Sequence, residues 1–147
     1  VRLPDTSFSF ANCARSLVYG AMVTLKLGMD ILAGENVRMD SLLGHGGFFK
    51  TPGTAQKLLA GALNTPVSVM ETAGEGGPWG MALLAAYRVH REKNETLEDY
   101  LTHHVFAGAN SVTIEPDAED VQGFVAYARR FEEGLSAERA AVSALKV

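Results

Sequence analysis

The sequence has almost no cysteine: Cys13 is the single one among 147 residues. One thiol cannot form an intramolecular disulfide, so the sequence is not that of a small secreted domain stabilised by several disulfides. Cys13 lies inside a helical pattern, which is typical of a small core residue. This cysteine usage fits a reducing compartment, and we expect a cytoplasmic protein.

The sequence also lacks an excess of positive charge, since 13 Lys and Arg residues stand against 17 Asp and Glu residues, for a net charge of −4. A non-specific nucleic-acid surface is therefore not expected. No apolar run approaches the ~18 residues that a membrane-spanning helix needs, and no secretory signal pattern is present. We expect neither a nucleic-acid partner nor a membrane.

Familiar catalytic motifs are missing as well. The sequence contains neither GxGxxG nor GxxxxGK[ST], its four histidines show no HExxH spacing, and Ser41 is outside any GxSxG elbow. The acidic pairs Glu119/Asp120 and Glu132/Glu133 fall on solvent faces of a predicted helix. We therefore predict no catalytic residue and no metal ligand in this chain.

What is present is an ordinary globular balance, 47% hydrophobic and 20% charged, in a chain long enough for one domain over residues 1–147. Apolar residues recur at three- and four-residue steps from Phe8 to Ala33, which predicts a long helix ended by Gly34. Its predicted inward face comprises Phe10, Ala14, Leu17, Ala21, Leu25, Met29 and Leu32.

The stretch from Ser41 to Ala86 organises the rest of the chain. It predicts a central strand over 37–44, a Gly-His-Gly-Gly turn, a helix over 54–63 with Ala55, Leu58, Leu59 and Ala62 inward, and a second strand at 66–69. A second glycine turn at 74–77 leads into a helix from Pro78. Small and apolar residues fill that helix, which predicts that it is buried.

Three further elements are predicted downstream. Thr96 and Asp99 form a loose capping box for a short helix over 96–104, and residues 112–114 read as a strand. Asp117 caps a helix that Gly134 is expected to break or kink, and a last helix covers 136–145.

The Gly-His-Gly-Gly turn admits two interpretations. Taken alone, paired glycines most often make a tight structural turn. The flanking strand and helix favour a ligand, because residues without Cβ can lie flat against a nucleotide and offer N–H groups to its phosphates. For Phe48 and Phe49, which follow directly, packing beneath the turn is favoured over stacking on a base.

Four motifs in this order resemble the C-terminal domain of the FGGY carbohydrate kinases, closest to the ribulokinase and xylulokinase branches. They are Gly46-Gly47, Lys50-Thr51, the run Leu63 to Val67, and the run Gly80 to Ala86. Glu71 falls where that family often has an acidic residue. The resemblance implies an α/β fold: half of an actin-like (ribonuclease H-like) ATPase domain pair, with a short, mostly parallel sheet flanked by helices.

The resemblance also implies a function, namely transfer of the ATP γ-phosphate to a hydroxyl of a ketose or polyol, with Mg²⁺. It implies that Gly46, Gly47, Lys50 and Thr51 bind ATP. The catalytic base, the first phosphate loop, most of the Mg²⁺ site and the sugar site belong to an amino-terminal domain in such kinases. The chain begins at Val1, so we expect a piece of a longer protein that is inactive alone and able to form a homodimer.

Two alternatives stay open. One is a non-catalytic α/β interaction module with structural glycine turns, and the other is a dinucleotide-binding oxidoreductase fragment, which the missing third glycine disfavours. The sequence also departs from the kinase pattern at Pro52, where many relatives have Ser or Asn, and at Gly61, where they have Asp. The Glu often found in their first helix is absent near Tyr19-Gly20.

Overall fold

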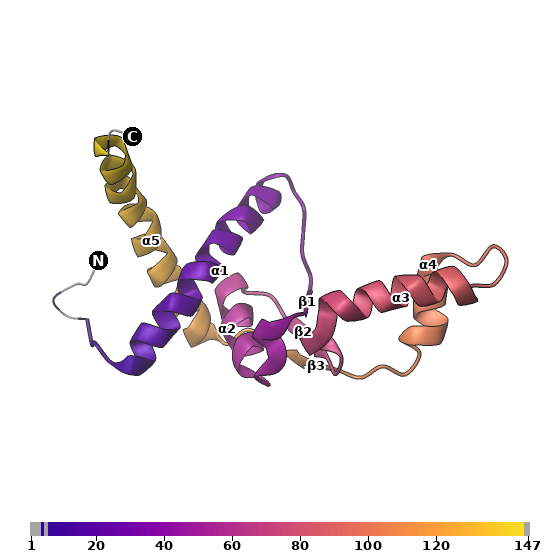
Figure 1. Ribbon diagram of the computed structural model, residues 1–147. Coiled ribbons are helices and arrows are strands. Elements are labelled where there is room, and N and C mark those ends of the chain that lie inside the picture. Colours follow the sequence, from indigo (N-terminus) through magenta and orange to yellow (C-terminus); the bar gives the residue numbers. More distant parts are fainter. Residues whose placement is uncertain (1–3, 5, 146–147) are drawn as a thin grey trace. The chain divides into compact units, whose positions relative to one another are not determined.

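A computed structural model describes residue 4 and residues 6–145 (Figure 1). The chain divides into two compact units. The first is built from residues up to 40, residues 58–65 and residues from 116 onward, and the second from residues 41–57 and 66–115. The helix over 54–63 contributes residues to both units.

The longer helices are α1 (Phe10–Gly34), α2 (Thr54–Leu63), α3 (Gly76–His90) and α5 (Ala118–Ala144). The strands are β1 (Leu42–Gly44), β2 (Val67–Met70) and β3 (Ser111–Ile114). The short helical segments are η1 (Gly47–Lys50), η2 (Ala73–Glu75), α4 (Leu97–Tyr100) and the π-helix η3 (Leu101–Val105).

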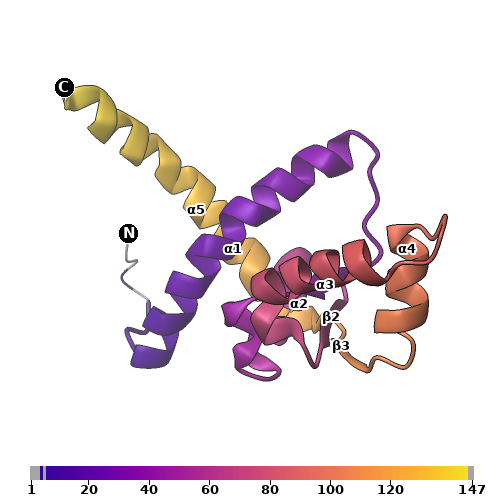
Figure 2. The same ribbon diagram turned by 45° about the vertical axis from the view of Figure 1, so that its right-hand side comes forward.

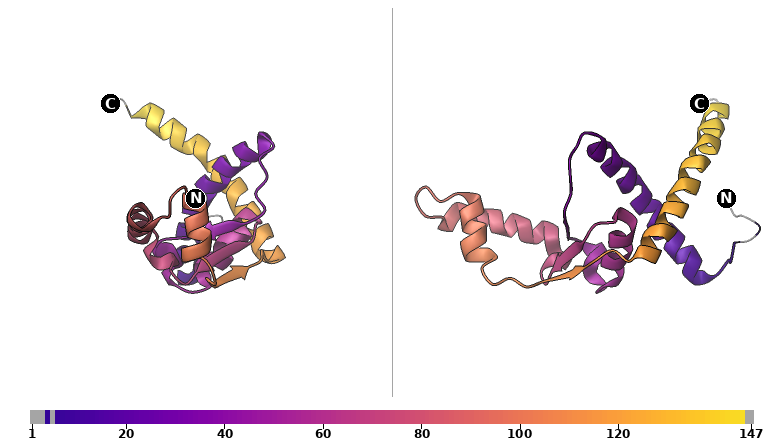
Figure 3. Two further views of the ribbon diagram at one scale, coloured as in Figure 1. Left: turned by 90° about the vertical axis from the view of Figure 1, so that its right-hand side faces the viewer. Right: turned by 180° about the vertical axis from the view of Figure 1, so that it is seen from behind.

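The first unit has its core where α1 and α5 cross (Figure 3). The rings of Tyr19 and Phe124 meet edge to face with centroids 5.0 Å apart, and Val23, one turn after Tyr19 in α1, is fully buried. The Tyr127 hydroxyl donates a hydrogen bond to the Ser16 carbonyl oxygen at 3.0 Å. An aromatic cluster and one hydrogen bond therefore join two segments about a hundred residues apart in sequence.

The buried face of α1 differs from the predicted one. Tyr19, Met22 and Val23 are the buried residues, whereas Phe10 is 90% exposed and Leu17 is 73% exposed. Apolar residues occur almost all round this helix, so periodicity alone does not select a face. The position of α5 selects it, and the predicted inward stripe is largely exposed in this chain.

Helix α1 is long and apolar. By length and composition alone this 25-residue helix, which contains an 18-residue window with a mean hydropathy of 1.4, could cross a membrane. Core helices of soluble proteins and signal sequences meet the same criterion, so the observation by itself assigns no membrane role.

The second unit contains a three-stranded sheet in the order β1-β2-β3. The pair β1–β2 is parallel, with Leu42 opposite Val67, and the pair β2–β3 is antiparallel, with Val67 opposite Ile114. The sequence pattern predicts the first strand over 37–44 and in a central position. Instead it is three residues long and lies at one side of the sheet, and β2 is central.

Helix α3 is exposed rather than buried. It begins at Gly76, two residues before Pro78, and no residue of α3, all of which the structure describes, is buried. Its contacts are aromatic: Trp79 meets Phe106 with ring centroids 5.8 Å apart, and the end of α3 lies beside α4 (Figure 2), where the Tyr87 and Tyr100 rings are 5.4 Å apart. Small residues alone therefore do not indicate burial.

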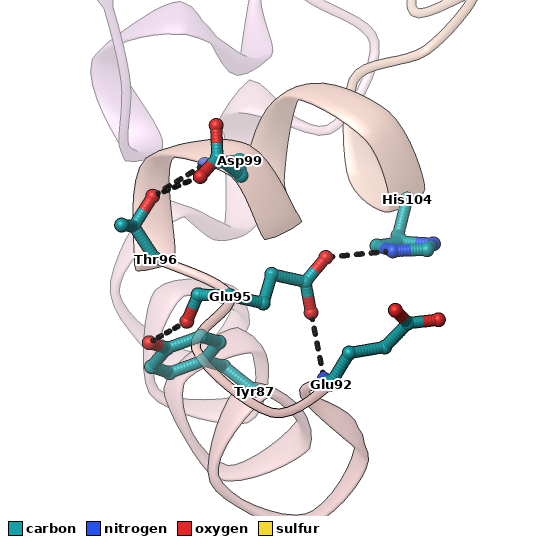
Figure 4. Close-up of polar contacts among 6 residues, drawn as sticks. All are labelled: Tyr87, Glu92, Glu95, Thr96, Asp99 and His104. Carbon is teal, nitrogen blue, oxygen red and sulfur yellow. Dashed lines mark hydrogen bonds and ion pairs between the residues drawn. The ribbon is translucent and has the colours of Figure 1, made fainter.

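The turn between α3 and α4 is held by polar contacts (Figure 4). The Thr96 hydroxyl accepts a hydrogen bond from the Asp99 N–H at 3.1 Å, which confirms Thr96 as the N-cap of α4. The Asp99 carboxylate accepts from the Thr96 hydroxyl at 2.6 Å, whereas in a complete capping box it would accept from the Thr96 backbone N–H. The Glu95 carboxylate accepts from the Glu92 N–H at 3.0 Å and lies 2.9 Å from His104 Nε2.

Helix α5 begins as predicted and ends later than predicted. The Asp117 carboxylate accepts hydrogen bonds from the N–H groups of Glu119 and Asp120, so the N-cap is confirmed. The helix then continues through Gly134 to Ala144 without the predicted break. A single glycine costs only about 1 kcal/mol relative to Ala in a helix, which does not end a helix unless tertiary contacts or a proline add to it.

Candidate functional site

The two glycine turns of the second unit lie against each other. The Gly46 N–H donates a 2.7 Å hydrogen bond to the carbonyl oxygen of Ala73. A Cβ placed on Gly76 would lie 3.0 Å from the Cβ of His45, so the two backbones approach closely here. The fold thus brings together two turns that lie about thirty residues apart in sequence.

The first turn depends on two glycines with different tasks. Gly46 has φ 97° and ψ −178°, a conformation that is essentially restricted to glycine. At Gly44 a Cβ would lie 2.5 Å from the Phe49 ring, so this ring packs directly on the strand end. Phe49 therefore fills space beside the turn as predicted, whereas Phe48 is 47% exposed.

Gly47 differs from its neighbours because its surroundings are open. Apart from Gly47, its two chain neighbours and the backbone of its own helical segment, no described atom lies within 4 Å of the position that a Cβ would take there. Gly47 begins η1, and Thr51 follows the end of η1 as an exposed C-cap residue. The backbone around Gly47 is accessible to a ligand, which is the property that the predicted role requires.

Lys50 connects the two turns. Its ammonium group forms a 2.7 Å ion pair with the Glu75 carboxylate, and its aliphatic stem lies over Gly74. Both charged side chains are more than half exposed, so the pair is of the kind that contributes at most about 1 kcal/mol to stability. Lys50 can therefore exchange this partner at little cost.

Beside the turns the second unit has a hollow of about 780 Å³. Of the four residues predicted to bind ATP, Lys50 lines it, while Gly46, Gly47 and Thr51 do not. Glu71, the acidic residue to which the resemblance points, lines it as well. Its apolar lining comes from Phe49, Val69, Met70, Trp79, Val112 and Ile114.

Gln56 is a residue of this hollow that the sequence patterns do not single out. It is 5% exposed, and its Nε2 donates hydrogen bonds to the backbone oxygens of Val67 at 3.1 Å and Val112 at 2.8 Å. The side chain thereby bridges β2 and β3 from the first turns of α2. The sequence offers one signal for Gln56: it is a polar residue that directly follows Ala55, which belongs to the predicted inward face of this helix.

The described residues contain no group of three or more His, Cys, Asp or Glu side chains that could hold a metal ion. The acidic side chains of the hollow, Glu71 and Glu75, are both exposed.

Known proteins share this fold. The structure resembles that of xylulose kinase from Lactobacillus acidophilus, with a TM-score of 0.65 and 19% identity over 87% of this chain. It also resembles gluconate kinase from the same organism, with a TM-score of 0.62 and 18% identity over 85% of this chain. The chain spans about a quarter of the length of each, 24%. These likenesses confirm the predicted α/β, actin-like kinase fold.

Sequence comparison gives the family. No curated protein sequence matches the chain significantly. Residues 3–89 match the FGGY family of carbohydrate kinases, C-terminal domain, and this match covers the glycine turns, Lys50 and Gln56. With more than half of the chain matched, it belongs to the FGGY family of carbohydrate kinases as a C-terminal domain.

Proposed function

We propose that the chain is the ATP-binding part of a kinase that transfers the γ-phosphate of ATP to a hydroxyl of a ketose or polyol. The observation that carries this proposal is the meeting of the two glycine turns, with Gly46 N–H bonded to Ala73, beside a hollow large enough for a nucleoside. Bare backbone next to an apolar hollow is what a nucleotide requires.

The residues present fit ATP. The hollow of about 780 Å³ is within the range of small-molecule sites, about 300–1,000 Å³. Phe49 and Trp79 supply aromatic surface for a flat base. Gly47 leaves the backbone open, and Lys50 can exchange Glu75 for a phosphate oxygen, because the exposed pair is weak.

A Mg²⁺ ion at a nucleotide is usually held by one or two carboxylates together with phosphate oxygens, and the described part of the chain gathers no group of three or more possible ligand side chains. We therefore assign the metal mainly to the nucleotide phosphates and to the amino-terminal domain. The sugar site and the catalytic base are assigned to that domain as well.

Phosphoryl transfer requires the nucleotide, its phosphates and the acceptor hydroxyl to be held in line. A lone C-terminal part leaves the phosphates in water, where charge stabilisation is small. We propose that the 147-residue chain binds adenine nucleotide weakly and has no kinase activity alone.

The Gly47→Val variant tests the nucleotide site. Two methyl groups at Gly47 should abolish the NMR shifts that ATP induces while the far-ultraviolet circular dichroism stays unchanged, because the position is open. Gly28→Val, in α1, is a matched control at another open glycine and should leave the shifts intact. Unchanged ATP binding by Gly47→Val would contradict the assignment.

A coupled assay of ADP release with several ketoses and polyols tests the function. We expect no sugar-dependent turnover by the chain alone and restored turnover when an amino-terminal half of an FGGY kinase is added. Sugar-dependent turnover by the chain alone would place the catalytic base here. Absence of nucleotide binding even in the reconstituted pair would reject the proposal.

A second candidate is the non-catalytic interaction module, because α3 exposes large apolar side chains: Met81 is 73% exposed, Leu84 54% and Val89 75%. A docking role predicts that Met81→Glu abolishes association without affecting ATP-induced shifts. Membership of the kinase family removes the third interpretation, an oxidoreductase fragment.

A further inference from the structure

Gln56 presents its amide in one fixed orientation. The two protons on Nε2 have two acceptors, the backbone oxygens of Val67 and Val112. A flipped amide would direct Oε1 at two carbonyl oxygens, where no proton is available, so these bonds determine which end is nitrogen. The remaining polar atom of the side chain, Oε1, is consequently held as an acceptor.

The Oε1 atom is left available. It accepts no hydrogen bond from the described residues, although Gln56 is only 5% exposed overall. Oε1 is also not among the fully enclosed polar atoms without a partner, and the hollow is the open space that Gln56 lines. A carbonyl oxygen in such a place gains strongly from a ligand that brings a donor.

The surroundings of this acceptor select the kind of ligand. The apolar lining includes Val69, Val112 and the rings of Phe49 and Trp79, which favour a flat aromatic group over a polyhydroxylated sugar. Resting on the nucleotide-binding function proposed above, we propose that Gln56 Oε1 accepts a hydrogen bond from the exocyclic amino group of adenine. Gln56 is thus a specificity-determining residue for the base.

The selectivity arises because Gln56 Oε1 can only accept a hydrogen bond. A site built to bond an N–H group rejects the analogue that lacks it, because the buried acceptor is then desolvated without a partner. Since the amide cannot flip without losing both strand contacts, Gln56 cannot adapt by offering its N–H end to a base that carries an acceptor.

The test compares two ligands on the unaltered chain, so that folding is not a variable. ATP and purine riboside 5′-triphosphate differ only by the 6-amino group, and their Kd values are measured by NMR titration. We expect ATP to bind about five- to tenfold more tightly. Equal Kd values would overturn the inference and leave the proposed function standing, whereas no binding of either nucleotide, even with an amino-terminal half added, would overturn both.

Two variants then locate the effect. Gln56→Met keeps the length of the side chain and removes both hydrogen-bonding ends, so the ratio of the two Kd values should fall to about one. A loss of stability alone would weaken both ligands equally and keep the ratio. Glu71→Gln is the matched control, since Glu71 is another acceptor that lines the hollow, and it should retain the ratio. Loss of the ratio in Glu71→Gln but not in Gln56→Met would overturn the assignment.

Discussion

At the scale of single residues, the shape of the first glycine turn is set by the backbone of Gly46. Its φ of 97° with ψ of −178° is closed to residues with a Cβ. Gly47, its neighbour, has no such requirement and an open environment. The two adjacent glycines therefore have different roles: Gly46 adopts the backbone conformation that the turn needs, and Gly47 leaves the backbone of the turn accessible.

This division predicts different costs for the same substitution. Gly46→Ala should lower the free energy of unfolding by about 1–3 kcal/mol, because alanine is strained in that conformation. Gly47→Ala should change it by no more than about 0.5 kcal/mol. Urea denaturation measures both, and equal values for the two variants would contradict the distinct backbone roles.

The contribution of Tyr127 to the stability of the fold depends on pH. Burial raises the pKa of its phenol above 10.0, because desolvation disfavours the phenolate. The unfolded state therefore loses this proton first, so the contribution of Tyr127 is complete below about pH 10 and is lost as the pH rises through the raised pKa.

For Tyr127→Phe we expect a loss of about 0.5–1.5 kcal/mol at neutral pH, since the hydrogen bond to Ser16 disappears. The difference in unfolding free energy between the two proteins should shrink as the pH rises from about 9 to about 11. Chemical denaturation across this range measures it, and the comparison cancels the titration of the lysines. If the difference in unfolding free energy grew with pH, the pKa of Tyr127 would be lowered by folding rather than raised.

At the scale of elements, α2 and α5 approach each other at Gly61. A Cβ at this position would lie 2.8 Å from the Cβ of Asp120 and 3.4 Å from its carbonyl carbon, so an atom of one helix must move. Asp120 already occupies the space that a side chain at position 61 would need.

Gly61→Ala should therefore destabilise the first unit, since overpacking costs about 1–3 kcal/mol and exceeds the gain in helix propensity. Gly123→Ala, in α5, makes the same chemical change at a helical glycine with open surroundings, and it should stabilise the chain by about 0.5–1 kcal/mol. Thermal and urea denaturation provide the measurement. Stabilisation by both variants would mean that the two helices are not in tight contact.

A substitution at Ala82 tests whether another surface covers α3. A buried small-residue helix would be overpacked by Ala82→Leu, but Ala82 is exposed. We expect a change of no more than about 0.5 kcal/mol in the 147-residue chain. A loss above about 1 kcal/mol, measured by urea denaturation, would show that another surface covers this face of α3.

At the scale of the whole molecule, the apolar surface of α1 is the dominant feature. Leu17 is 73% exposed and Ile31 is 70% exposed, along a helix that contains an 18-residue window with a mean hydropathy of 1.4. Large exposed apolar surfaces mark sites that another surface covers. Self-association of the isolated chain is the simplest consequence.

Sedimentation velocity should accordingly show concentration-dependent association of the chain, and Leu17→Glu with Ile31→Glu should reduce it, because a charge opposes burial of the surface. Thr24→Glu is the control, since Thr24 is an exposed polar residue of the same helix and should leave association unchanged. A strictly monomeric wild-type chain would contradict the predicted homodimer.

The sequence by itself determined the features that depend on near neighbours. The extent of α1 and α2, the caps at Thr96 and Asp117 and the strand–glycine turn–helix order all follow from residues within a few positions of one another. The family motifs are of the same local kind, and for that reason the order of the residues along the chain is enough to indicate the kinase family.

The tertiary structure decided everything that depends on distant partners. Which face of α1 is buried depends on α5, about a hundred residues away, and the continuity of α5 through Gly134 depends on the free energy of the whole helix. The exposure of α3 likewise depends on tertiary contacts, because none of the described residues covers this helix enough to bury one of its residues. Gln56 is the clearest case, because its two acceptors lie 11 and 56 residues further along the chain. Only their arrival at one point turns an ordinary helical glutamine into a fixed acceptor beside an apolar hollow.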